Sequence, residues 1–241
     1  MSRKVSARMV AAWLREIGVD YVPVSAPASN TIPAPPIQKE KFGGALASSI
    51  DPARESLEDI RKELAECARC PLCSGRRTVV FGVGNPQARL MFVGEGPGEE
   101  EDRQGEPFVG AAGRRLNQWI ARLGLARKDI YIANIVKCRP PGNRAPLPEE
   151  AAACLPFLRR QILAIRPEAI CALGAVAMQY LLDTNEKITR VRGNWRQFEG
   201  VPVLPTFHPA YILRNQTREA EVFADFALLA ERLARNSHQA P

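Results

Sequence analysis

The chain of 241 residues lacks the features of a membrane or secreted protein. It has no apolar run that approaches the roughly 18 residues of a bilayer-spanning helix. Residues 1–10 carry basic side chains, without the apolar core of a secretory signal. Six cysteines without such a signal are expected to be reduced thiols or metal ligands, not disulfides. We therefore predict a cytoplasmic protein with no membrane partner.

The charge balance is only modestly basic. Lys and Arg total 33 against 26 for Asp and Glu, which gives a formal net charge of +7, and 26 of the 33 cations are Arg. This excess is compatible with a polyanionic partner, and it does not identify one by itself.

Composition divides the chain into four parts. An amphipathic pattern predicts a helix in residues 1–20, and a Pro/Ala/Ser-rich stretch predicts a linker over residues 21–55. The compact domain is predicted to span residues 56–236, with a disordered tail at 237–241. Ser56 and Asp59, spaced as in a helix-capping box, mark the start of the domain. We expect a monomer.

Four apolar runs of strand length alternate with helical patterns in the compact part. The runs cover residues 90–93, 130–136, 169–173 and 201–207. The helical patterns cover residues 112–123, 148–165, 175–182 and 219–234. This alternation predicts an α/β fold with three layers, α/β/α, around a central four-stranded, mainly parallel sheet.

The segments at the ends of the four runs carry most of the candidate chemistry. They are Gly94-Glu95-Gly96-Pro97-Gly98 after the first run, Asn134 near the end of the second, Gly174 after the third and His208 after the fourth. Ligands of open α/β sheets bind outside the carboxyl ends of the strands. Small residues, an amide and an imidazole are therefore predicted to meet at one rim.

The glycine-rich segment after the first run is not a nucleotide-binding motif. The dinucleotide fingerprint needs a third glycine where Glu99 stands, and the P-loop pattern does not occur in the sequence. The acidic run that ends at Asp102 would also repel a pyrophosphate. The glycines instead let the backbone approach a flat neutral ligand and offer it N–H groups. One carboxylate of the acidic run, facing the rim, would be enough to hold a water.

Cysteine spacing predicts a metal centre. The six cysteines are Cys67, Cys70, Cys73, Cys138, Cys154 and Cys171. Cys67 with Cys70, and Cys138 with Cys154, are two pairs that suit a tetra-thiolate site, and zinc and a [4Fe–4S] cluster both accept four cysteines. A zinc site of two C-x-x-C knuckles would need a second such pair. Cys171 lies in an apolar run and is predicted to be a buried structural thiol, whereas spacing leaves the role of Cys73 open.

Three further features border the predicted rim. His208 is one of only two histidines, and its place between an apolar run and Pro209 favours a functional role over a structural one. Phe108 is either a core residue or a plate on which a ring stacks, and sequence alone favours the core. The triplet Ile212-Leu213-Arg214 places apolar wedge candidates beside a cation, as in loops that enter a DNA groove.

Four of these segments together resemble motifs of the iron–sulfur (type 4) uracil-DNA glycosylases. They are residues 94–102, 107–110, 134–141 and 208–214, and they occur in the order and spacing of that family. The resemblance covers the chain from about Leu64 onward and leaves residues 1–50 outside. It implies a [4Fe–4S] cluster held by Cys67, Cys70, Cys138 and Cys154, with Cys73 as an extra thiol, in a protein of the bacterial or archaeal cytosol.

The resemblance also implies an activity and its residues. The enzyme would flip uracil out of single- or double-stranded DNA and hydrolyse its N-glycosidic bond, leaving an abasic site without a lyase step. The implied catalytic residues are Glu101, His208 and Glu95, and the implied substrate-binding residues are Gly94, Gly96, Phe108 and Asn134. The DNA-binding residues would be Ile212, Leu213 and Arg214.

Two other functions fit parts of the sequence. An Fe–S electron carrier would use the cysteines but would have no use for His208 or Asn134. A zinc-containing DNA-binding module would need neither iron nor catalysis. Metal analysis and an excision assay on uracil-containing oligonucleotides distinguish these functions from the glycosylase.

Overall fold

A computed structural model describes residues 55–236 of the chain. The predicted helix in residues 1–20, the linker up to residue 54 and the tail at 237–241 lie outside the described residues. Within the described part, no helix is long and apolar enough to cross a membrane.

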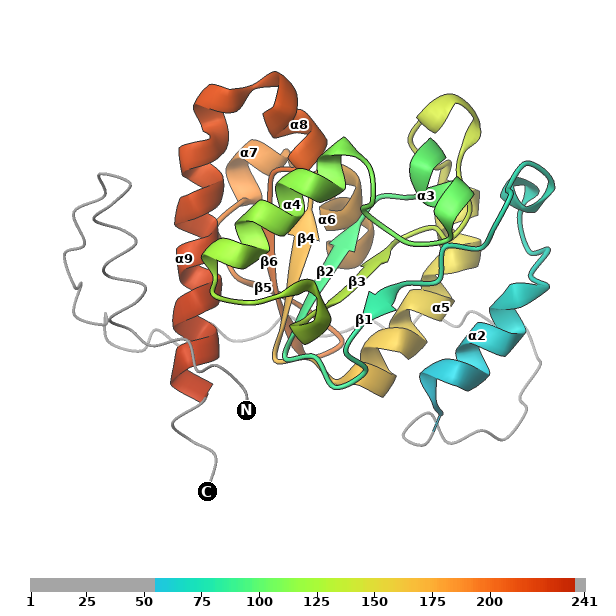
Figure 1. The fold of residues 1–241 in the computed structure, drawn as a ribbon, viewed down its shortest axis with the longest axis horizontal. Helices are drawn as coiled ribbons and strands as arrows, with labels where there is room; N and C mark the ends of the chain where they lie inside the picture. Colours follow the sequence, from blue (N-terminus) through green and yellow to red (C-terminus); the bar gives the residue numbers. More distant parts are fainter. Residues whose placement is uncertain (1–54, 237–241) are drawn as a thin grey trace.

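A six-stranded mixed sheet forms the centre of the fold (Figure 1). Its strands, in spatial order, are β1 (Val83–Gly84), β3 (Tyr131–Asn134), β2 (Leu90–Gly94), β4 (Ala169–Leu173), β6 (Val201–Thr206) and β5 (Arg196–Phe198). The four inner strands are parallel and match the four predicted runs. The edge strands β1 and β5 pair antiparallel and were not predicted, because two or three residues without a buried side chain leave no apolar alternation to detect.

Helices cover both faces of the sheet, which confirms the predicted three layers (Figure 1). One face packs against α5 (Pro148–Ile165), α6 (Ala175–Leu182) and α7 (Ile188–Val191). The other face packs against α4 (Ala111–Arg122), α8 (Pro209–Arg214) and α9 (Glu219–Asn236). Side chains of a strand alternate between the faces, so Met91 and Val93 of β2 join the first layer whereas Leu90 and Phe92 join the second.

The remaining elements lie around this core. Helix α2 (Leu57–Ala65) begins with the predicted capping box of Ser56 and Asp59 and packs through Ile60 and Leu64 against Phe157 of α5. Helix α3 (Glu99–Gln104) follows β2 directly. Four short 3₁₀ turns complete the described chain: η1 (Pro71–Ser74), η2 (Arg127–Asp129), η3 (Pro141–Asn143) and η4 (Gln216–Arg218).

Strand register brings the predicted functional segments together at one edge of the sheet. Gly94, at the end of β2, pairs with Asn134 at the end of β3. Gly174, which follows β4, adopts a positive φ of 92° and donates its N–H to the Thr206 carbonyl at 2.9 Å. A Cβ at Gly174 would lie 2.9 Å from the Cβ of His208, so a glycine is needed for these two strand ends to approach.

Candidate active site and metal centre

A cavity of about 450 Å³ opens at the carboxyl ends of the parallel strands, where the sequence predicts a ligand. Six of the seven residues predicted for catalysis and substrate binding line it: Glu95, Gly96, Glu101, Phe108, Asn134 and His208. Gly94 packs directly against Asn134 and Phe108. A Cβ at Gly94 would lie 2.5 Å from Asn134 Oδ1 and 2.6 Å from the Phe108 ring. Its lack of a side chain makes room for both.

Asn134 presents an acceptor that nothing in the described chain satisfies. The residue is 2% exposed, and its Oδ1 is the one buried side-chain N or O atom within residues 55–236 that has no hydrogen-bond partner. Leaving a buried acceptor unpaired costs about 1–3 kcal/mol, so native structures rarely keep one. Asn134 lines the cavity, so its Oδ1 is open to a donor that enters there.

Phe108 is held in a strained backbone conformation from two sides. Its φ is +55°, a left-handed value that is unusual for an aromatic residue. On one side, Arg127 donates to the Phe108 carbonyl at 3.2 Å and also to the Pro107 carbonyl. On the other, Glu101 Oε1 accepts from the N–H groups of Val109 and Gly110 at 3.0 and 2.9 Å. The residue is 6% exposed, which agrees with a place in the core, and it also lines the cavity, where the stacking role stays a prediction.

The Glu101 carboxylate is largely committed to the backbone. Besides the two bonds to the Phe108 loop, Oε2 accepts from the Gly98 N–H at 3.1 Å. An ionised carboxylate has about four acceptor positions, so three backbone donors leave room for one further partner. Glu101 joins the start of α3 to the Phe108 loop and still faces the cavity.

His208 caps the short helix α8 and borders the cavity. Its Nδ1 accepts from the Ala210 N–H at 3.1 Å, so in the neutral ring the proton lies on Nε2. Burial, with a smaller contribution from the nearby cation of Arg214, lowers the pKa of His208 to about 4, although Glu101 opposes the shift. The ring centroids of His208 and Phe108 lie 5.6 Å apart. At neutral pH this histidine is therefore an uncharged hydrogen-bond donor.

Glu95 is a second carboxyl group of the cavity. It is half-buried, and burial raises the pKa of its carboxyl above the ordinary value. Among residues 55–236, no hydrogen-bond donor to this carboxylate is found, in contrast to Glu101. A carboxylate with a raised pKa and open acceptor positions is a suitable proton acceptor.

The three residues predicted to contact DNA differ in their exposure to solvent. Ile212 is fully buried in the layer between α8 and the sheet, which does not agree with its predicted role as an exposed wedge. Leu213 is half-buried, and Arg214 is exposed and lines the cavity. A six-residue helix turns successive side chains by about 100°, so Ile212 faces inward while Arg214 faces out.

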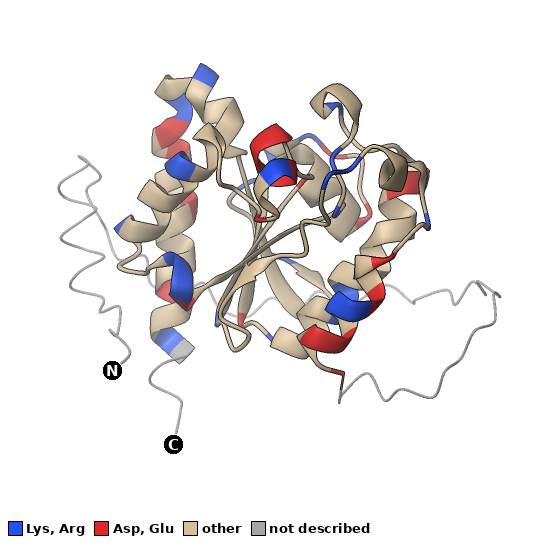
Figure 2. Cartoon of the chain, turned by 45° about the vertical axis from the view of Figure 1, so that its right-hand side comes forward, with Lys and Arg blue, Asp and Glu red and all other residues tan. Residues whose placement is uncertain are grey.

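The cavity also has lining residues that the sequence did not single out for it, among them Pro140, Asn143, Arg144 and Tyr211. Arg144 is paired with the buried Glu150 of α5 at 2.6 Å, and Arg139 reaches Glu99 in the acidic first turn of α3 at 3.5 Å. Figure 2 shows the acidic α3 and basic loop segments at the same edge of the fold. Arg127 was not predicted either, because its contacts to the Phe108 loop involve residues 19 and 20 positions away and leave no local pattern.

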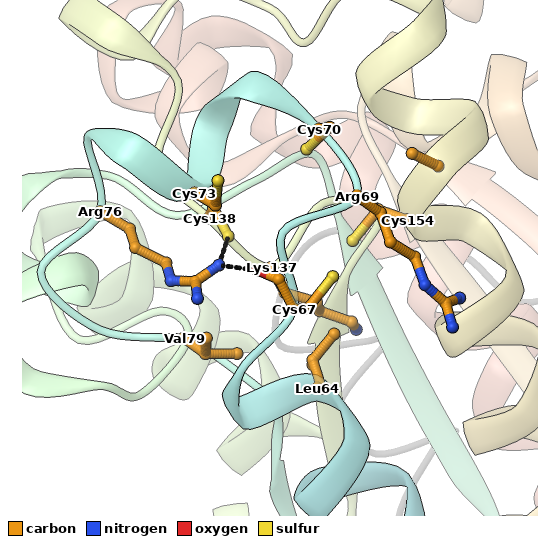
Figure 3. A pocket seen from close by; sticks show the side chains of 11 residues that line it. Leu64, Cys67, Arg69, Cys70, Cys73, Arg76, Val79, Lys137, Cys138 and Cys154 are labelled. Atoms are coloured by element: carbon orange, nitrogen blue, oxygen red, sulfur yellow. Dashed lines mark hydrogen bonds between the residues drawn. The ribbon is translucent and has the colours of Figure 1, made fainter.

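A second, small cavity is lined by five of the six cysteines (Figure 3). These are Cys67, Cys70, Cys73, Cys138 and Cys154, from the segment after α2, the segment after β3 and helix α5. Cys138 and Cys154 are 8% and 7% exposed, and the other three are half-buried. Cys171 lies in β4, fully buried and outside this cavity, as its apolar surroundings predicted.

The electrostatics of the thiol cavity are set by burial and by one cation. Burial raises the pKa of Cys70 and Cys138 and raises the pKa of Cys154 to about 11. Arg76 opposes this shift at Cys138, because its guanidinium lies 3.4 Å from the Cys138 sulfur and is anchored on the Cys67 carbonyl at 2.7 Å (Figure 3). Within residues 55–236, no three Cys, His, Asp or Glu side chains are grouped as a single metal ion requires.

Comparisons with known proteins agree with this geometry. The model of the uracil DNA glycosylase superfamily matches residues 81–232. A type-4 uracil-DNA glycosylase of Thermotoga maritima is 50% identical over 169 residues, which cover 68% of this chain and 87% of that protein. A type-4 uracil-DNA glycosylase of Archaeoglobus fulgidus is 45% identical over 186 residues, 73% of this chain and 93% of that protein. A type-5 uracil-DNA glycosylase of Pyrobaculum aerophilum is 32% identical over 194 residues, 67% of this chain and 85% of that protein.

The chain is therefore a member of the uracil DNA glycosylase superfamily. Its strand-end cavity is lined by the Asn134 amide, the fixed ring of Phe108 and the neutral imidazole of His208. Within that superfamily, the higher identity to the type-4 enzymes places the chain in the type-4 uracil-DNA glycosylase family.

The close packing of α4 under the Phe108 loop generates the first prediction. A Cβ at Gly113 would lie 1.8 Å from the Phe108 carbonyl oxygen. Gly113→Ala should therefore displace the loop and lower the free energy of unfolding by about 1–3 kcal/mol, as overpacked cores do. Denaturant unfolding measures this. Gly75→Ala is the control, because Gly75 has a negative φ and a Cβ there would meet no atom within 4 Å. Equal stability of the two variants would contradict the prediction.

Proposed function

We propose that this uracil-DNA glycosylase acts through the strand-end cavity, with the roles of its residues set by the contacts described above. The enzyme belongs to DNA repair and hydrolyses the N-glycosidic bond of uracil in DNA. The observation that carries the assignment of the site is the unpaired Asn134 Oδ1 beside the fixed ring of Phe108. We place the activity in residues 56–236, acting as a monomer in the cytosol of a prokaryotic cell.

Asn134 and Phe108 would bind the flipped base. Uracil has an N3–H donor next to an O4 acceptor, so Asn134 can accept from N3–H through Oδ1 and donate to O4 through its amino group. Cytosine reverses this pattern and would leave the buried amide unpaired, which disfavours it strongly. Phe108 would stack on the base. The free energy of folding offsets the strain in its backbone, so the ring is already in place before DNA binds.

His208 would stabilise the leaving uracil. As the glycosidic bond breaks, negative charge develops on the uracil O2, and donors aimed at such charge supply a large part of catalysis. Neutral His208 holds its proton on Nε2 and can donate it as a hydrogen bond without losing it. Backbone N–H groups near Gly96 would add to this stabilisation.

Glu101 and Glu95 would act on the sugar side of the glycosidic bond, each with a different role. Glu101, fixed by three backbone donors, would favour the positive charge that develops on the sugar and hold a water at its remaining acceptor position. Glu95, whose pKa burial raises, would take the proton from that water or from a neighbouring one. Water then completes hydrolysis and leaves an abasic site, so that no covalent intermediate is needed and no lyase step follows.

DNA would be held by the basic rim of the cavity. Arg214 is exposed beside the cavity mouth, and the half-buried Leu213 precedes it. Arginine beside an apolar side chain is suited to a strand whose base has been flipped out. Ile212 is left out of this contact because it is buried in the core.

The thiol cavity fits a [4Fe–4S] cluster held by Cys67, Cys70, Cys138 and Cys154. These four thiols line one space, and the Arg76 cation beside it favours the thiolate of Cys138. When bound, the cluster would supply a cross-link between α5, the segment after β3 and the segment after α2. Lys137, in the segment after β3, is fully buried next to Cys138 and donates to the Asn134 carbonyl at 2.9 Å, so the same segment serves both cavities.

An excision assay tests the site. Under single-turnover conditions with uracil-containing oligonucleotides, His208→Ala should bind DNA normally but excise on the order of a hundredfold more slowly, because its interaction is made mainly in the transition state. Phe108→Ala should lose both binding of the flipped base and rate. Arg159→Ala, at an exposed position of α5, is the control. A wild-type rate for folded, iron-replete His208→Ala would remove His208 from the mechanism.

The protonation state of His208 gives a separate test. In ¹⁵N-histidine-labelled protein, one of the two histidine signals should show the Nε2–H form and should not titrate between about pH 5.5 and 8, because burial lowers its pKa to about 4. His208→Gln assigns that signal. The unfolded chain binds the His208 proton more tightly than the fold does, so the contribution of His208 to stability should fall as pH drops from 6.5 toward 4, whereas the raised pKa of Asp225 acts in the opposite direction. The difference in stability between wild type and His208→Gln isolates the His208 contribution. A His208 signal that titrates near 6.5 would contradict the assignment.

Iron content tests the ligand set. Wild-type protein should hold about four irons per chain, and alanine at Cys67, Cys70, Cys138 or Cys154 should each reduce that content. Cys73→Ala and Cys171→Ala are the matched controls and should retain it. If Cys73→Ala loses the iron while Cys70→Ala keeps it, the ligand set is wrong.

A further inference from the structure

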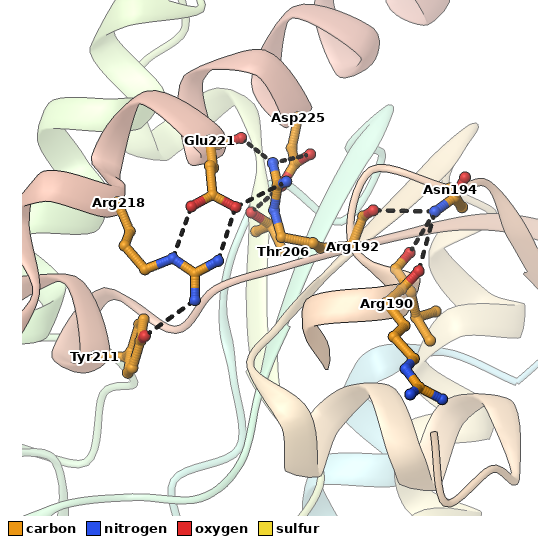
Figure 4. A network of polar contacts seen from close by, with 9 residues as sticks. Arg190, Arg192, Asn194, Thr206, Tyr211, Arg218, Glu221 and Asp225 are labelled. Carbon is orange, nitrogen blue, oxygen red and sulfur yellow. Dashed lines mark hydrogen bonds and ion pairs between the residues drawn. The ribbon is translucent and has the colours of Figure 1, made fainter. Parts of the chain in front are cut away.

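A cluster of polar side chains joins Thr206 and Tyr211, which lie on either side of His208 in the sequence, to helix α9 (Figure 4). Asp225 of α9 is 2% exposed, and Thr206, the last residue of β6, is fully buried. The Thr206 hydroxyl donates to Asp225 Oδ2 at 2.6 Å. Arg192 donates to both oxygens of the same carboxylate, at 2.7 and 3.1 Å. Thr206 precedes His208 by two residues, so these bonds fix the backbone where the turn that carries His208 begins.

The same chain of contacts continues to the other end of the turn (Figure 4). Arg192 also reaches Glu221 at 3.2 Å, and Arg218 donates to Glu221 through two nitrogens at 2.7 and 3.1 Å. Arg218 further donates to the hydroxyl of Tyr211 at 3.4 Å. Tyr211 belongs to α8 and lines the active-site cavity. The contacts therefore join α9 to residues on both sides of His208.

Phe207 lies within cation–π distance of the two arginines of this cluster. The guanidinium carbons of Arg218 and Arg192 lie 4.6 and 5.4 Å from the centroid of the Phe207 ring. The Tyr211 ring lies 5.0 Å from the same ring. Phe207 is the residue directly before His208 and is 2% exposed, so its ring leaves the adjoining backbone little freedom.

Stability alone does not account for these polar contacts. Burial raises the pKa of Asp225 to about 6 even though Thr206 and Arg192 favour its charged form, which indicates how unfavourable the site is for a carboxylate. Buried ion pairs can often be replaced by apolar side chains without loss of stability. Directional bonds differ from apolar packing in fixing a geometry, and α8 has only six residues, too few to hold its own orientation.

We infer that Arg192, Thr206, Arg218, Glu221 and Asp225 form a positioning network that sets the imidazole of His208 against the cavity. The inference rests on the role proposed for His208. None of the five residues lines the active-site cavity, and they act through the backbone of residues 206–211. Displacement of a catalytic group by about 1 Å can cost a hundredfold in rate, so loosening the network should slow excision and leave DNA affinity unchanged.

Thr206→Val tests the buried half of the network, because valine keeps the shape of threonine and removes the hydroxyl. We expect the single-turnover excision rate to fall about 10- to 100-fold, with affinity for uracil-containing DNA within about twofold of wild type. Thr206→Ser, which keeps the hydroxyl, should restore the rate. Arg218→Met tests the outer half and should have a smaller effect in the same direction.

Arg160→Met is the matched control for Arg218→Met. Arg160 forms comparable ion pairs with Glu55 and Glu63, but on α5, in the layer on the other side of the sheet. The Arg160→Met substitution should lower the melting temperature without changing the excision rate of the folded enzyme. The ¹⁵N signal of His208 should shift in Thr206→Val and stay unchanged in Arg160→Met.

Two outcomes separate this inference from the assignment of His208 itself. If Thr206→Val lowers only the melting temperature, while the rate and the His208 signal stay at wild-type values, the network is merely structural and the inference is wrong. If His208→Ala excises at the wild-type rate, the role of His208 fails instead, and the shift of the His208 signal still reports whether the network positions the ring.

Discussion

Parallel pairing of β2, β3, β4 and β6 is the constraint on which the rest of the structure depends. It directs four carboxyl ends to one edge and so gathers residues that are more than 100 positions apart in the chain. The register then determines the neighbours within that edge, since Gly94 lies opposite Asn134 and Gly174 adjoins His208. A side chain at either glycine would fill the space that the amide or the imidazole occupies.

The sequence predicts those features that leave a periodic or short-range signal. The inner strands and the four long helices have clear apolar periods, and the thiols and the glycine-rich segment are recognisable by spacing. Ile212 shows the limit of such patterns: next to a cation it resembles a wedge, but the direction in which α8 packs turns it into the core. The edge strands are too short to carry a period at all.

Contacts between distant residues account for most of what the sequence did not reveal. Arg127 reaches the carbonyls of a loop that is separated from it by α4, and Asp225 reaches a strand on the other side of His208. One signal was available for Asp225, since it lies among Val222, Phe226 and Leu229 on the apolar face of a helix. A carboxylate in such a place needs partners, although the sequence does not say which. Glu101 is similar, because its three backbone donors are set by loop geometry.

The role proposed for Asn134 places activity and stability in opposition at one atom. That oxygen is buried and has no hydrogen-bond partner among the described residues. An apolar side chain of similar size would remove this penalty, so random substitution under selection for heat resistance alone would tend to discard the amide. Engineering for a higher melting temperature should therefore leave position 134 untouched, so that the group proposed to read the base is kept.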